Sequence, residues 1–158
     1  MVKEILKYPD PILRKKSEEV EEITEETKKL AQELKETMLA NQGIGLAAPQ
    51  VGVLKRIIVV QAEKGPQIFI NPKIIKKSRE TLIEEEGCLS FPGLFLKIKR
   101  AKEVEVEALN ENGEKIFLKA EGLPARIFQH EIDHLDGVLF IDRLSFWQKL
   151  KFKLKLWP

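Results

Sequence analysis

The chain has 158 residues, the length of one ordinary domain, and its 43% hydrophobic and 33% charged residues are typical of a globular protein. Its 27 basic and 25 acidic residues are mixed along the chain, so the net charge of +2 argues against a dedicated nucleic-acid-binding protein and predicts no DNA partner. One Cys and two His exclude an internal disulfide, a multi-Cys zinc finger and a Cys-held iron–sulfur cluster, and they favour a reducing compartment.

The N-terminal residues do not have the pattern of a targeting segment. Lys3, Glu4 and Pro9 interrupt this stretch before an apolar run can form, so we expect no signal peptide. No window approaches the roughly 18 apolar residues that a membrane helix needs. Because no repeat, linker or change of composition divides the chain, we expect a single domain over residues 1–158, in the cytoplasm and without a membrane span.

Residues 24–40 are predicted to form an amphipathic helix. Apolar residues recur every four positions from Leu30 to Met38, which places them on one helix face. Thr24 suits the N-cap, and the two Gly residues within Asn41–Gly45 make continuation of the helix costly.

Two short strands are predicted next. The β-branched run in Arg56–Val60 indicates a buried strand. Ile68–Ile70 indicates a second strand, which Asn71 and Pro72 are expected to stop.

A β-hairpin is predicted further along the chain. Glu103–Leu109 alternates strictly between polar and apolar residues, and the alternation resumes over Ile116–Ala120. Asn110–Gly113 between them has the composition of a turn. We therefore expect an antiparallel pair with one solvated face.

A second helix is predicted over Gly122–Asp136. Pro124 suits the first turn, where a missing N–H costs nothing, and Gly137 suits the position after the C-cap. The broad apolar face indicates a central, largely buried helix, and its members are Leu123, Ile127, Phe128, Ile132 and Leu135. Few strands and two unlike helices favour an α+β fold over a regular βαβ repeat.

Both His residues of the chain lie in this helix, in the sequence His130-Glu131-Ile132-Asp133-His134. Residues four apart share one helix face, so the two imidazoles can converge on one metal ion. Glu131 follows the first of them and can reach a metal-bound water as a general base. The alternative is a surface helix with two incidental His residues, which fits a buried helix and a His-poor chain badly.

A catalytic metal usually takes three protein ligands, so the His pair needs a third. One familiar arrangement would place a His where Phe140 stands. Asp136 lies too close along the helix to wrap around the metal, and Asp142 has no supporting motif. Cys88 is the remaining candidate, because it follows a Gly that lets the backbone approach closely; taken alone, it also fits a small buried hydrophobic residue.

The segment Gly43–Gln50 is rich in small residues. Its Gly and Ala residues let another backbone come close, and Gln50 offers an amide donor. On its own, the segment also fits a Gly-rich connector between the first helix and the first strand.

Three segments together are similar to those of a known family. Gly43–Gln50, Glu86–Ser90 and Gln129–Leu135 resemble, in this order and at compatible spacing, the three motifs of peptide deformylase. The resemblance runs from about Lys7 to Leu144. It implies an α+β fold in which antiparallel or mixed β-sheets pack around the central helix that carries the His-Glu-x-x-His motif. It also implies a hydrolase that removes the N-formyl group from the formylmethionine of newly made polypeptides and releases formate.

The motif match also implies the roles of single residues. One metal ion per chain, Fe²⁺ with Zn²⁺, Ni²⁺ or Co²⁺ as substitutes, is expected on three ligands: Cys88, His130 and His134. Glu131 is expected to act as general base and acid while metal-bound hydroxide attacks the formyl carbon. The Gln50 side chain and the Leu89 backbone N–H are expected to form the oxyanion hole.

The resemblance also places the substrate. Ile44 and Ile127 match positions that line the pocket for the methionine side chain. The peptide beyond the methionine is expected to add as a strand along the backbone from Gly43 to Gly45 and near Gly87.

The C-terminal residues depart from the family, in which many members carry a longer basic helix at this place. Lys and apolar residues alternate with period two over Gln148–Pro158, which predicts a terminal strand with a buried apolar face and a solvated lysine face, not a helix. Contact of the lysine face with the ribosome is a hypothesis, and contacts with a membrane or a second copy are its alternatives.

Two other functions share part of these motifs. A metallopeptidase that cuts internal peptide bonds also uses His-Glu-x-x-His, and it would keep its metal through Asp142 instead of Cys88. A non-catalytic metal-binding or ribosome-associated protein would hold the metal without releasing formate from a formylated peptide.

Overall fold

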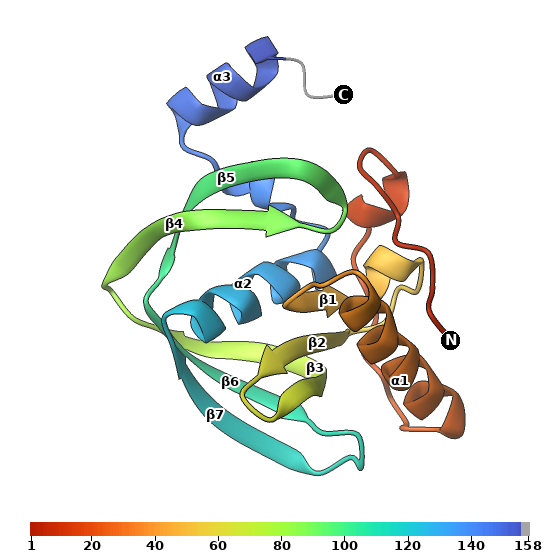
Figure 1. The fold of residues 1–158 in the computed structure, drawn as a ribbon. Coiled ribbons are helices and arrows are strands. Elements are labelled where there is room, and N and C mark those ends of the chain that lie inside the picture. Colours follow the sequence, from red (N-terminus) through yellow and green to blue (C-terminus); the bar gives the residue numbers. More distant parts are fainter. Residues whose placement is uncertain (156–158) are drawn as a thin grey trace.

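The computed structural model describes residues 1–155 and has the α+β fold expected from the sequence. A buried helix, α2, lies between a five-stranded antiparallel sheet of order β1-β2-β3-β6-β7 and a two-stranded antiparallel ribbon of β4 and β5 (Figure 1). The helices are α1 (Glu25–Ala40), α2 (Leu123–Leu135) and α3 (Phe146–Lys155), with short 3-10 turns η1 (Pro11–Arg14), η2 (Ala48–Val51) and η3 (Phe140–Arg143). The strands are β1 (Gly45–Ala47), β2 (Ile57–Ala62), β3 (Gly65–Lys77), β4 (Thr81–Cys88), β5 (Phe91–Ala101), β6 (Glu103–Leu109) and β7 (Lys115–Glu121).

Strand β2 is buried on both faces, because a helix covers each side of the larger sheet at this point. Ile57 and Val59 belong to the apolar cluster that includes α1. Ile58 and Val60 belong to the cluster that includes α2. Burial on both faces explains why the sequence here is an uninterrupted β-branched run and not an alternating one.

Helix α1 begins and ends where the sequence predicts. The Thr24 hydroxyl accepts a hydrogen bond from the backbone N–H of Thr27 at 3.3 Å, and the Thr27 hydroxyl accepts one from the backbone of Thr24 at 3.2 Å. Asn41 is the C-cap residue. The chain then turns, so that β1 and η2 run alongside α2.

The predicted end of the second strand is wrong, because β3 continues well past Asn71 and Pro72. The register shifts between Ile70 and Lys73, which marks a bulge. Asn71 has a positive φ of 51°, and its side-chain amide exchanges hydrogen bonds of 2.8 and 2.9 Å with the backbone of Val20. Pro72, which has no N–H, therefore lies where the ladder is already interrupted.

The β6–β7 hairpin has the predicted pairing, with Val104, Val106 and Ala108 buried on one face. Gly113 occupies the left-handed region in its turn, with φ of 82°. The β4–β5 ribbon was not predicted from the sequence. Its strands carry many charged residues. Phe91 and Ile98 of β5 are buried in an apolar cluster with η3, and Glu86 and Arg100 are buried as an ion pair between the two strands.

The prediction of a strand at the C-terminus is wrong, because residues 146–155 form helix α3. The backbone N–H of Gln148 donates to the Ser145 hydroxyl at 3.3 Å, and the Gln148 amide oxygen accepts from the backbone N–H of Ser145 at 3.0 Å. This capping box is a helix-start signal that outweighs the period-two alternation. Phe146 and Trp147 are 73% and 70% exposed, whereas Phe152 packs on the core near η3. Residues 156–158 of the predicted strand lie outside the described part of the chain.

No helix within residues 1–155 combines the length and the apolar character that a membrane crossing requires.

Candidate active site

Helix α2 presents His130, Glu131 and His134 from the centre of the molecule, and all three side chains are buried. The two imidazole rings lie one turn apart, with their centroids 5.1 Å from each other. Pro124 lies in the first turn of the helix, and Gly137 follows the C-cap with a positive φ of 73°, as predicted. The helix therefore ends directly after its second His.

The end of β4 brings Cys88 to the His pair. The Cys88 Sγ lies 3.4 Å from the Nε2 of His134, and one ligand atom from each of Cys88, His130 and His134 lies within 4.8 Å of the others. Thiolate and imidazole donors at such spacing fit a single transition-metal ion. Among residues 1–155, this is the one group of three such side chains close enough to hold a metal ion.

The two acidic alternatives for the third ligand point elsewhere. The Asp142 carboxylate pairs with the Arg14 guanidinium and accepts the backbone N–H of Leu139 at 2.9 Å. The Asp136 carboxylate lies 3.0 Å from Arg56. The geometry therefore favours Cys88 as the partner of the His pair.

A buried carboxylate fixes the orientation of the first His. The Nδ1 of His130 lies 2.8 Å from a Glu86 carboxylate oxygen. Burial raises the pKa of Glu86, but hydrogen bonds from His130 and Arg100 outweigh burial and hold that pKa well below its usual range. An ionised Glu86 accepts a hydrogen bond from the Nδ1–H of His130, which leaves the Nε2 lone pair free to bind a metal.

Buried guanidinium groups hold Glu86 in turn. Arg100 donates to it through Nε and Nη2 at 2.8 and 3.0 Å, and Arg126 donates through Nη1 at 2.6 Å. Arg100 also donates to Asp133 at 2.7 Å, and Asp133 accepts two further bonds from Arg143. We call these five residues the Glu86 network. It ties α2 to the β4–β5 ribbon beneath the His pair.

Sequence reasoning assigned no role to this network. One signal could have found its centre, because side chains two apart on a strand share a face and Glu86 precedes Cys88 by two. A second signal is Asp133, which lies three residues after His130 and so shares its side of the helix. The two Arg partners come from β5 and α2, and no local pattern connects them.

Electrostatics differ sharply among the three α2 side chains. Burial raises the pKa of Glu131 to about 7, and the Glu131 Oε1 has no hydrogen-bond partner among the described residues. Burial lowers the pKa of His130, but Glu131, Cys88 and Glu86 outweigh burial and raise that pKa well above its usual value. Burial lowers the pKa of His134 well below its usual value.

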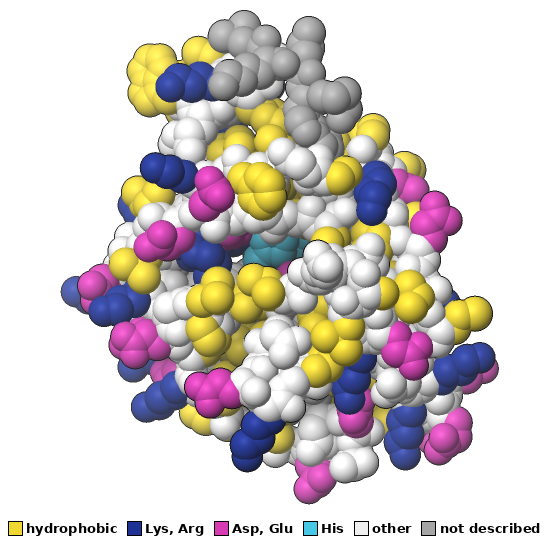
Figure 2. Space-filling view, in the orientation of Figure 1, with side chains coloured by type: hydrophobic (Ala, Val, Ile, Leu, Met, Phe, Trp, Pro, Cys, Tyr) yellow, Lys and Arg dark blue, Asp and Glu magenta, His cyan; other side chains and the backbone are white. Residues whose placement is uncertain are grey.

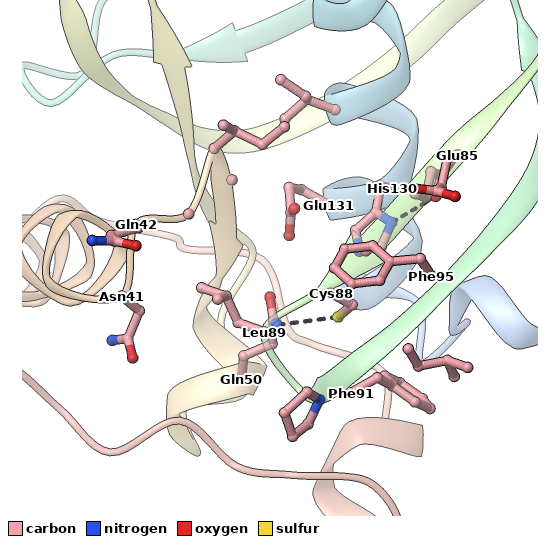
Figure 3. A pocket seen from close by; sticks show the side chains of 18 of the residues that line it. Asn41, Gln42, Gln50, Glu85, Cys88, Leu89, Phe91, Phe95, His130 and Glu131 are labelled. Atoms are coloured by element: carbon pink, nitrogen blue, oxygen red, sulfur yellow. Dashed lines mark hydrogen bonds and ion pairs between the residues drawn. The ribbon is translucent and has the colours of Figure 1, made fainter. Parts of the chain in front are cut away.

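Gln50 lies in η2, on the other side of Cys88 from the helix (Figure 3). Its amide oxygen accepts the backbone N–H of Ala47 at 3.0 Å, which orients the amide. Its Nε2 then points to the Cys88 Sγ at 3.6 Å and to the Ser90 hydroxyl at 3.1 Å. The amide nitrogen is thus directed toward Cys88 and Ser90 and not into the solvent.

These side chains lie in a pocket of about 500 Å³ between β1, the end of β4 and α2. Figure 2 shows a His side chain at the bottom of this hollow, with hydrophobic side chains around its mouth. Ten of the eleven predicted site residues line the pocket; the exception is His134, which lies beneath the surface. The ten are Gly43, Ile44, Gly45, Gln50, Gly87, Cys88, Leu89, Ile127, His130 and Glu131.

The fold and this site together define an α+β protein in which Cys88, at the end of β4, joins two His residues of a buried helix in a group that could hold a metal ion, with a carboxylate beside it. A model of the family described as polypeptide deformylase matches residues 2–150. The chain belongs to the peptide deformylase family, and this membership makes it an enzyme that removes the formyl group from an N-terminal methionine.

Relatives agree in sequence and in structure. The chain is 51% identical to the peptide deformylase of Pseudothermotoga lettingae over 99% of this chain and 91% of that protein. A crystal structure of peptide deformylase from Thermotoga maritima is 46% identical and has a TM-score of 0.89, with 92% of this chain and 99% of that chain covered. A crystal structure of the Ehrlichia chaffeensis peptide deformylase in complex with actinonin is 44% identical with a TM-score of 0.89, over 99% of both chains.

Proposed function

We propose that the chain, acting as one cytoplasmic domain, hydrolyses the formyl amide of N-formylmethionine on newly made polypeptides and releases formate, with one metal ion at the Cys-His-His cluster. The observation that carries this proposal is the convergence of Cys88, His130 and His134 next to the buried carboxylate of Glu131. Fe²⁺ is the proposed metal, with Zn²⁺, Ni²⁺ or Co²⁺ as substitutes, because thiolate and imidazole suit all four ions. When bound, the metal would act as a Lewis acid that lowers the pKa of a coordinated water and polarises the formyl carbonyl.

Glu131 takes the proton of the attacking water and passes it to the leaving nitrogen. Its carboxylate is buried at the pocket wall, its Oε1 has no hydrogen-bond partner within residues 1–155, and burial raises its pKa to about 7. A carboxylate with a pKa near the working pH can both accept and return a proton.

Gln50 and the backbone N–H of Leu89 stabilise the negative charge that grows on the formyl oxygen. The Gln50 amide is held by Ala47, so its N–H groups need no reorientation during the reaction. One such donor is typically worth about 3 kcal/mol of transition-state stabilisation.

The substrate backbone adds to β1 as a strand. In the larger sheet β1 is an edge strand, and among the described strands it pairs with β2 alone. Ile44 accepts a hydrogen bond from Gln61 across this pair, so by alternation the N–H and C=O of Gly45 face the open edge. An extended peptide can bond there while its methionine side chain lies between Ile44 and Ile127.

Replacing Gly45 with Ala is expected to lower kcat/KM about 100-fold, because catalysis tolerates little displacement of a reacting group. A Cβ at this position would lie 2.6 Å from the Glu131 Oε2 and 2.9 Å from the Ile127 Cγ2, so Glu131 must shift. Steady-state formate release measures the loss, and metal content serves as the control because no ligand is touched. Unchanged kcat/KM with metal retained would contradict a fixed position for Glu131.

The direct test of the proposed function is formate release from formyl-Met-Ala-Ser by iron-loaded protein. Release of formate that depends on the metal supports the proposal. Absence of formate from a folded, metal-loaded protein would favour a non-catalytic metal-binding protein, and cleavage of internal peptide bonds would favour a metallopeptidase.

Two substitutions separate the deformylase from the metallopeptidase at the level of the metal. Asp142→Asn is expected to keep full metal content, because the Asp142 carboxylate pairs with Arg14 away from the cluster. Cys88→Ala is expected to lose the metal together with formate release. Metal analysis of both variants decides between the two ligand sets, and the opposite pattern would support the metallopeptidase.

The hypothesis of ribosome association is supported by helix α3, which presents exposed lysines although it is a helix and not the predicted strand. Lys149, Lys151 and Lys153 are exposed on it beside the exposed Phe146 and Trp147, and Figure 2 shows basic and hydrophobic side chains together at this end of the molecule. Replacing the three Lys residues with Glu is expected to abolish co-sedimentation with ribosomes at low salt while formate release stays unchanged. Unchanged co-sedimentation would contradict the hypothesis.

A further inference from the structure

Phe95 is a large aromatic side chain at the mouth of the pocket that the proposed chemistry does not use. It is 63% exposed, yet it lines the pocket. Figure 3 shows its ring extending from β5 toward the pocket. An exposed aromatic ring at the entrance of a peptide-binding pocket is available for contact with the peptide.

The ring occupies the space above Gly87. Phe95 pairs with Gly87 across the β4–β5 ribbon, and a Cβ at Gly87 would lie 2.8 Å from the Cε1 of the ring. This space is on the outer face of the ribbon, because the preceding residue, Glu86, points to the opposite face and bonds His130. Phe95 therefore lies on the side of β4 that faces away from α2.

The position of Phe95 indicates which side chain of the substrate it would contact. This inference rests on the proposed function, in which the methionine side chain enters the pocket beside Ile127, on the α2 side. Side chains of an extended peptide alternate between two faces, so the side chain of the next residue points away from α2. It then points to the face on which Phe95 lies, and Gly87 has no side chain to separate the two.

We propose that Phe95 is a specificity-determining residue, which gives the enzyme a preference for an apolar or aromatic residue directly after formylmethionine. The ring offers an apolar surface for that side chain and no hydrogen-bonding group for a polar one. The preference concerns binding of the peptide and not the reacting atoms, since Phe95 contributes neither a proposed ligand nor a proton-transfer group.

The test compares formyl-Met-X-Ser peptides in which X is Leu, Phe, Ser or Asp. In the iron-loaded native chain, kcat/KM for Leu and Phe is expected to exceed that for Ser about fivefold. Phe95→Ala is expected to reduce this ratio to below about twofold, through KM and not kcat. Phe95→Tyr keeps the ring and should keep the ratio, whereas Phe95→Lys should move the preference to Asp.

Ile83→Ala is the matched control. Ile83 is also 63% exposed and belongs to the same ribbon, but it does not line the pocket. Its replacement is expected to leave the ratio unchanged.

Three results would overturn the proposal while leaving the deformylase function intact. The first is a Leu-to-Ser ratio that Phe95→Ala does not change. The second is an equal loss for all four peptides, which would indicate a structural role in covering Gly87. The third is a preference that Phe95→Ala alters only in formyl-Met-Ser-X peptides. Failure of the native chain to release formate from any of the peptides would instead overturn the proposed function on which the proposal rests.

Discussion

Replacing Glu131 with Gln is expected to lower formate release about 1,000-fold, within the range that a positioned general base contributes. Gln has nearly the same size as Glu, so it fills the buried space against Gly45 without a new clash. It cannot accept the proton of the attacking water or return it to the leaving nitrogen. The effect should therefore fall on kcat, with KM for the formylated peptide largely unchanged.

Metal analysis separates this loss from a loss of the metal. Glu131 is not one of the three clustered donors, so Glu131→Gln is expected to bind one metal ion per chain, as the native chain does. Cys88→Ala, in contrast, should lose the bound metal and formate release together. Formate release within tenfold of the native rate in Glu131→Gln would remove the residue from the proposed mechanism.

Replacing Glu86 with Ala is expected to lower the free energy of unfolding by about 3–5 kcal/mol, the usual cost of removing one partner from a buried ion pair. The side chains of Glu86, Arg100 and Arg126 are 4%, 4% and 7% exposed. Without Glu86, Arg126 keeps its bonds to the backbone carbonyls of Ile98 and Leu82, and Arg100 keeps its bond to Asp133. Metal affinity should also fall about 10- to 100-fold, because His130 loses the acceptor that orients its ring.

Glu84→Ala provides the matched control for this prediction. Glu84 precedes Glu86 by two on the same strand but is exposed. Its replacement is expected to change the free energy of unfolding by less than about 0.5 kcal/mol. Denaturant titration of the metal-free proteins measures both values, and equal effects of the two substitutions would contradict a buried role for Glu86.

The residues that the sequence could identify are those whose chemistry has a local pattern. His130 and His134 are one turn apart, and a helix brings such residues together wherever it is placed. Cys88 could be connected to them only by elimination and by resemblance, because 46 residues separate it from His134. The helices α1 and α2 were predicted for the same reason, since caps and apolar faces are short-range signals.

The features that the sequence did not reveal depend on contacts between distant segments. Arg100 and Arg126 are charged residues that ordinarily lie at the surface, and only the fold shows that both reach Glu86. Pro72 normally ends a strand, but a bulge held by the contact of Asn71 with Val20 accommodates it. In the tail, the alternation of Lys and apolar residues concealed the capping box between Ser145 and Gln148.

The open edge of β1 has a consequence for the time at which a substrate can be processed. A strand edge recognises backbone N–H and C=O groups, and a substrate can offer these only while its first residues are unpaired. In a polypeptide whose N-terminus already belongs to a helix or a sheet, these N–H and C=O groups are hydrogen-bonded within the polypeptide itself. On the proposed binding mode, deformylation therefore competes with the folding of each client, and clients whose first residues fold slowly remain accessible for longest.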